Sequence, residues 1–275
     1  MMNKEPMFLL TRPLAWLDER EALTGQWLME HFGMDIAALE NTINVISFSI
    51  DQLGESVKAF SPGTRDLESE ENMDKLKKFV AVALLVEALD SLHAARRLLL
   101  SGYFSKMFSC VRTLIEALRS ADICKDDEAK AREWLEHREV KKSAKSELHL
   151  IVKGMMRSYD FLSQTGTHPM VRSTVMSSLG KPFAFPDSPN MQAQDSEKHT
   201  DIEKITGEPI DKLNQFAGLF LKYVNENYLI DWDKAPEIRQ KRDIILELAN
   251  CRRFQRVSLA SSLSLDCVRE RGWKC

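Results

Sequence analysis

The sequence contains little glycine, 11 residues in a chain of 275, and no stretch in which apolar and polar residues alternate among β-branched side chains. Half-buried strands produce that alternation, so a β-sheet is not expected. The residues instead form long runs rich in leucine, alanine, glutamate and lysine. A chain of this length can also bury a sizeable apolar core. We therefore expect an all-α protein.

Features that mark a cellular location are scarce as well. The longest apolar run has about 11 residues, whereas a membrane-spanning helix needs roughly 20, and the apolar part of the N-terminus is too short for a signal peptide. The cysteines are odd in number and form no close CxxC pair, which favours reduced thiols over disulfides or a zinc site: Cys110, Cys124, Cys251, Cys267 and Cys275. These absences predict a soluble, cytoplasmic protein without membrane contact.

Sequence motifs for the common kinds of active site are missing too. The chain has no GxxxxGK[ST] or GxGxxG phosphate loop, no HExxH and no GxSxG. Its six histidines are scattered without an i, i+4 pair, and no pair of Glu-x-x-His segments indicates a di-iron bundle. We therefore expect no metal or cofactor. The net charge of −3 weakens the case for nucleic-acid binding.

Two strongly helical runs, 73–101 and 104–123, form the centre of the expected fold. Gly102 separates them, and glycine commonly ends a helix with a left-handed turn. The pattern therefore predicts an antiparallel hairpin over 73–124. The segment 79–89 is apolar nearly all the way round, so we expect neighbouring helices on every side of it.

The rest of the chain predicts further helices and one irregular region. Helices are expected over 13–32, 34–60, 127–162, from Pro209 to about 229, and from Pro236 onward. Residues 163–208, with three prolines between 182 and 189, would form a long irregular excursion. The prediction is an up-and-down antiparallel bundle of about six or seven helices. It would form one domain over 1–260, with a loosely held tail over 261–275.

The helix expected over 34–60 has the most regular pattern in the chain. Its apolar positions alternate in steps of three and four residues, a period typical of a long helix that lies alongside a partner: Ile36, Leu39, Ile43, Ile46, Ile50, Leu53, Val57 and Phe60. The partner is either another helix of the same bundle or the same helix of a second subunit. The second alternative would make the protein a dimerising scaffold.

One group of candidate site residues lies on the central hairpin. Arg112 and Glu116 fall on one border of the apolar stripe of 104–123, and their spacing makes them neighbours. His168, which follows Ser163 in a Ser-x4-His element, reaches this pair if the 127–162 helix folds back along the hairpin. The three side chains would form either a structural polar network or an acid–base site for a phosphate substrate.

A second group lies in the charged helix that follows. Arg132 and His137 are five residues apart, so they reach one ligand only from a shared groove or across a dimer. Around them, residues 130–157 carry eight lysines and arginines against four glutamates. This basic face is a possible contact for the phosphates of RNA or a nucleotide. An ordinary solvent-exposed helix surface is the alternative.

The hairpin resembles the HEPN-like group of small helical bundles, and most of all bacterial families of unknown function. The resemblance covers about 73–170. It rests on a glycine and an aromatic residue, an apolar residue and an R-[ST]-L-x-E segment: Gly102, Tyr103, Phe108, Arg112, Thr113, Leu114 and Glu116, with Ser163 and His168 later. It implies an all-α bundle, often dimeric, in bacterial stress, toxin–antitoxin or phage-defence systems.

Active members of this group are metal-independent ribonucleases with an R-x4-6-H motif. By resemblance, an arginine such as Arg132 would steady the phosphate and His137 would move a proton. Here Glu133 follows the arginine, where the group usually carries a small polar residue. We therefore expect a non-catalytic binding or regulatory component. The alternative is a metal-independent ribonuclease or a nucleotide-binding enzyme.

Overall fold

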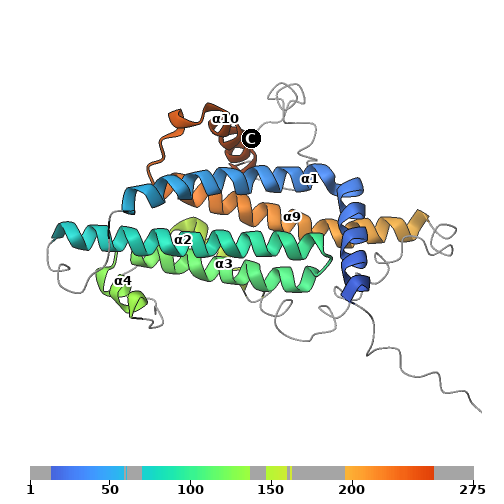
Figure 1. The fold of residues 1–275 in the computed structure, drawn as a ribbon, viewed down its shortest axis with the longest axis horizontal. Coiled ribbons are helices and arrows are strands. Elements are labelled where there is room, and N and C mark those ends of the chain that lie inside the picture. Colours follow the sequence, from blue (N-terminus) through green and yellow to red (C-terminus); the bar gives the residue numbers. More distant parts are fainter. Residues whose placement is uncertain are drawn as a thin grey trace, which may run out of the picture.

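The computed structural model describes residues 14–58, 60, 70–136, 147–159, 162 and 196–250. Within these ranges every regular element is a helix and none is a strand, which confirms the all-α class. In chain order the elements are α1 (Leu14–Val57), α2 (Glu70–Leu100), α3 (Phe104–Cys124), α4 (Glu128–Leu135), α5 (Leu150–Met156), α9 (Ser196–Asn227), the 3₁₀-helix η2 (Trp232–Lys234) and α10 (Pro236–Asn250). The long helices α1, α2, α3 and α9 lie lengthwise beside one another (Figure 1).

The predicted central hairpin is present as α2 and α3, which pack against each other along their length. Gly102 has a φ of 78°, the left-handed conformation expected of it. Its N–H donates to the carbonyl of Leu99 at 3.0 Å, and the N–H of Tyr103 donates to the carbonyl of Leu98 at 2.8 Å. These two bonds define a Schellman motif. A side chain at Gly102 would also meet Cγ2 of Thr24 at 2.9 Å, so both the turn and the packing require glycine.

The core is formed where α2 and α3 face each other and α1. Large side chains such as Leu85, Phe108 and Leu118 have no more than 1% of their surface exposed. The expectation that α2 is covered on every side over 79–89 is wrong. Val86 is 41% exposed and Glu87 is exposed as well, because α2 contacts α1, α3, α4 and α9 on its other sides.

The helix α1 combines the two N-terminal helices that the sequence predicted. Phe32 interrupts it with φ −131° and ψ 19°, one residue before the expected break at Gly33. The part before this kink turns across the end of the bundle (Figure 1). After the kink, the seam positions from Ile36 to Val57 are buried against α2 and α9. The partner of the seam is therefore within the same chain.

Two contacts show that α9 runs parallel to α1. The side chain of Asn214 donates to the backbone carbonyl of Asp35 at 3.1 Å. Further along both segments, Gln52 exchanges two bonds with the backbone of Asp231, at 3.0 and 3.1 Å. Later residues of the α9 segment thus contact later residues of α1. The bundle is antiparallel through α1, α2 and α3, and α9 lies parallel to α1 (Figure 1).

A continuous helix over 127–162 is not formed, which corrects the sequence prediction. The helix α4 ends at Leu135, residues 147–149 are not helical, and α5 begins at Leu150. His149 has an extended conformation with ψ 144°, and its N–H donates to a carboxylate oxygen of Asp122 at 2.7 Å. That contact with α3 fixes the chain direction just before α5, and no local pattern in the sequence encodes it.

The predicted irregular excursion over 163–208 is wrong in its last part. Residues 196–208 are helical, and Pro209 lies inside α9 instead of opening a helix. Pro209 and Ile210 are buried, so this turn is held by packing although proline removes a backbone hydrogen bond. Residues 163–195 and the tail 261–275 lie outside the described part of the chain. α10 begins at Pro236 as predicted and packs on α1 and α9.

In the part of the chain that the structure describes, no helix combines the length and the apolar character that crossing a membrane requires.

Candidate functional site

Arg112, Glu116 and Tyr159 meet between α3 and the residues that follow α5, and we call them the Arg112 cluster. Nε of Arg112 donates to the hydroxyl of Tyr159 at 2.7 Å and to Oε1 of Glu116 at 3.3 Å. The Tyr159 hydroxyl in turn donates to the same Glu116 oxygen. The guanidinium carbon lies 4.6 Å from the centroid of the Tyr159 ring. Each of the three side chains therefore bonds to the other two.

The Arg112 cluster lies at the edge of the bundle, with 30% of the Arg112 side chain and 44% of the Glu116 side chain exposed. Burial and the hydrogen bond to Glu116 raise the pKa of Tyr159, so its hydroxyl keeps the proton that it donates. Glu116 balances the charge of Arg112 within this cluster. The arrangement is chemically suited to joining two segments of the chain.

The predicted pairing of Arg112 with Glu116 is confirmed. Among the described residues, the third side chain of the cluster is Tyr159. His168 and Ser163, the predicted additions, lie outside the described residues. Tyr159 was not among the predicted site residues. Its hydroxyl at the end of an apolar stripe was the available sign of a polar partner.

In the second predicted group, Arg132 donates from Nε to Oε1 of Glu128 at 2.7 Å, one helical turn earlier on α4. Lys130 forms a similar ion pair with Glu133 at 2.7 Å. His137 lies outside the described residues. Two of the basic side chains predicted to face phosphate are therefore paired with acidic neighbours on their own helix.

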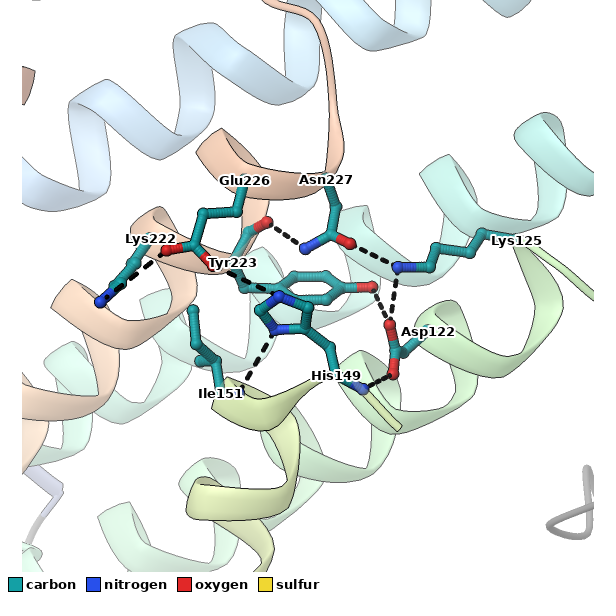
Figure 2. A network of polar contacts seen from close by, with 8 residues as sticks. All are labelled: Asp122, Lys125, His149, Ile151, Lys222, Tyr223, Glu226 and Asn227. Carbon is teal, nitrogen blue, oxygen red and sulfur yellow. Dashed lines mark hydrogen bonds and ion pairs between the residues drawn. The ribbon is translucent and has the colours of Figure 1, made fainter. Parts of the chain in front are cut away.

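A larger polar network, which the sequence did not predict, joins α3, α5 and α9 around Asp122 (Figure 2). The Asp122 side chain is only 2% exposed. Its Oδ1 forms an ion pair with Nζ of Lys125 at 2.8 Å and accepts a hydrogen bond from the Tyr223 hydroxyl at 3.1 Å. Its Oδ2 accepts the backbone N–H of His149 at 2.7 Å. The cation and the two hydrogen-bond donors around this buried carboxylate meet the hydrogen-bonding needs of both its oxygens.

The outer layer of this Asp122 network is formed by His149 and α9. Nδ1 of His149 accepts the N–H of Ile151 at 3.3 Å and so caps α5. On the other side of the ring, Nε2 lies 3.3 Å from Oε2 of Glu226. Nζ of Lys222 is 3.8 Å from Oε1 of Glu226. As Figure 2 shows, the His149 ring therefore lies between the start of α5 and the side of α9.

Asn227 closes the network at the end of α9. Its Oδ1 accepts a hydrogen bond from Lys125, and its Nδ2 donates to the backbone carbonyl of Tyr223 at 2.9 Å. The Tyr223 and Tyr228 rings meet edge to face, with centroids 6.3 Å apart. Burial raises the pKa of both tyrosines far above the usual range, so their hydroxyls stay protonated.

The buried thiol of Cys124 lies on the same end of α3. Burial, followed by the carboxylates of Asp127 and Glu133, raises its pKa to about 12. The thiol is therefore protonated at neutral pH. Because the thiolate is the reactive form, Cys124 is unsuited to act as a nucleophile.

Both polar groups attach α5 to α3. Asp122, late in α3, contacts His149 just before α5, whereas Arg112, earlier in α3, contacts Tyr159 just after α5. The two segments therefore run antiparallel, and the two contacts are equally far apart along both segments. Between these ends, Val152 and Met155 are buried. The Asp122 network and the Arg112 cluster thus hold the segment around α5 against α3.

The described residues contain no group of three or more His, Cys, Asp or Glu side chains that could hold a metal ion. No protein-family model, curated protein or solved structure matches the chain.

Proposed function

We propose that this protein acts by binding and has no catalytic activity of its own, as a regulatory or binding component of a bacterial stress, toxin–antitoxin or phage-defence system. The resemblance of the hairpin to HEPN-like bundles motivates the biological setting. The observation that supports a non-catalytic role is the closed Arg112 cluster, in which Glu116 and Tyr159 both bond to Arg112.

A ribonuclease of the HEPN type needs an arginine whose charge is directed at the phosphate of the substrate. In this chain Glu116 balances Arg112, and Glu128 balances Arg132. A phosphate that approached either arginine would also meet the negative charge of the paired carboxylate. That repulsion opposes the electrostatic attraction on which phosphate binding depends.

A scaffold that dimerises through the 36–60 seam would need an exposed apolar surface there, but the seam positions of α1 are buried. Ile36, Leu39 and Ile46 have no exposed surface, and α2 and α9 cover this side of α1. A second subunit would have to bind elsewhere on the bundle.

Incubation of the purified protein with tRNA and mRNA in a chelating buffer tests the proposal. We expect the RNA to remain intact and unbound at about 50 mM salt, where phosphate contacts are strong. Matched variants are His137→Ala, His168→Ala and Arg112→Ala, with Arg119→Ala as a control for removing an arginine from α3. Metal-independent cleavage that a histidine variant abolishes, while the protein stays folded, would show that the ribonuclease alternative is correct.

A further inference from the structure

His149 makes two contacts that depend differently on its protonation state. Nδ1 accepts the N–H of Ile151 at 3.3 Å, which requires an unprotonated nitrogen. Nε2 faces Oε2 of Glu226 at 3.3 Å and can donate to it in both the neutral and the charged ring. The neutral ring with its proton on Nε2 therefore satisfies both contacts at once.

Proton uptake changes the balance between these contacts. A proton on Nδ1 would point at the N–H of Ile151, so two donors would face each other and the cap would be lost. A positive charge at the start of a helix is also unfavourable, because the helix dipole is positive there. The same charge would strengthen the contact with Glu226, since a charged pair replaces a neutral donor and a carboxylate.

The charged and titratable groups around the ring come from two helices. From α3 they are Asp122, which accepts the backbone N–H of His149, and Lys125, which bonds to Asp122. From α9 they are Lys222, Tyr223 and Glu226, with the Tyr223 ring edge-on to the imidazole at 5.7 Å between centroids. Each of the two carboxylates is paired with a lysine, Asp122 with Lys125 at 2.8 Å and Glu226 with Lys222 at 3.8 Å.

We propose that His149 is a pH-sensitive cap, which on protonation releases the first turn of α5 and binds more strongly to Glu226 of α9. The backbone bond from His149 to Asp122 does not involve the ring, so the attachment of α5 to α3 at that point is kept. Histidine changes its charge between about pH 5 and 8, so the exchange falls within the range that cells experience. This inference does not depend on the proposed function.

Amide hydrogen exchange at Ile151, corrected for the intrinsic effect of pH, measures the release. We expect its protection to fall about fivefold between about pH 8 and pH 5, which corresponds to the loss of one helix cap. The amide of Leu114 in the core of α3 serves as the control for global stability and should show no such loss.

Two variants separate the cap from other acid effects. Asparagine is a good cap that does not titrate, so His149→Asn should make the protection of Ile151 independent of pH. Glu226→Gln removes the carboxylate that faces Nε2, so the protonated ring should gain no stronger contact with α9 in this variant. An equal loss of protection in wild type and His149→Asn would overturn the proposal.

A measurement on the wild-type protein covers the case in which a variant fails to fold. The nitrogen chemical shifts of the His149 ring report which nitrogen carries the proton at about pH 8. We expect the proton on Nε2. A neutral ring protonated on Nδ1 could not accept the N–H of Ile151, and that result would rule the cap out.

Discussion

Asp122→Ala is expected to lower the free energy of unfolding by about 3–5 kcal/mol, the usual effect of removing one partner from a buried ion pair. The substitution leaves Lys125, the Tyr223 hydroxyl and the N–H of His149 without their shared acceptor. Since the Asp122 side chain is only 2% exposed, water cannot readily replace the carboxylate. Urea denaturation, with the slope compared between variants, measures the change.

A neighbouring aspartate provides the control for this prediction. Asp126 is exposed, so Asp126→Ala should change the stability by no more than about 0.5 kcal/mol. Asp122→Asn keeps one oxygen acceptor and should fall between the two. Equal stabilities of Asp122→Ala and Asp126→Ala would show that the Asp122 network contributes little to the fold.

Ile46→Glu should prevent folding altogether. Ile46 has no exposed surface, and it lies in the seam of α1 that α2 and α9 cover. A carboxylate at that position would be buried, and burying an unpaired charge is among the most destabilising changes known for single residues. Circular dichroism should show the loss of helix, and size-exclusion chromatography should show aggregated or expanded protein.

Asn44→Glu is the matched control, because it introduces the same side chain on an exposed position of the same helix. We expect this variant to fold like the wild type. A folded Ile46→Glu protein that migrates as a smaller assembly would mean that the seam joins subunits, contrary to the packing of α1.

The hairpin could be predicted because local signals agree there. Gly102 gives the turn its left-handed residue, and apolar stripes on both sides give the helices their contact face. The break between the first two helices was predicted at Gly33 and occurs one residue earlier, at Phe32. At the hairpin turn, the residues that determine the geometry lie within a few positions of it.

Long-range contacts explain the errors. The 127–162 segment was predicted as one helix, yet α4 ends at Leu135 and α5 begins only at Leu150, directly after His149, whose N–H donates to Asp122. Pro209 is a normal first residue of a helix, but the burial of this turn lets α9 extend on both sides of it. Local propensity cannot predict either outcome.

The contrast between local signals and long-range contacts also explains which residues of the candidate site could be predicted. Arg112 and Glu116 were found because their i, i+4 spacing is local. Asp122, His149 and Tyr223 were missed because they come from three elements that only the folded chain brings together. The one available signal was an aspartate between Ala121 and Ile123, both of which are buried. A carboxylate in an apolar stretch of helix predicts a buried polar partner.

A double-mutant cycle on Arg112→Met and Tyr159→Phe tests most directly whether the polar side chains of α3 serve to anchor the segment around α5. Both substitutions keep much of the side-chain bulk while removing the hydrogen bond between Nε and the hydroxyl. We predict that the two effects on the free energy of unfolding are coupled by about 1 kcal/mol, as for other residues in direct contact. Strictly additive effects would contradict this anchoring role.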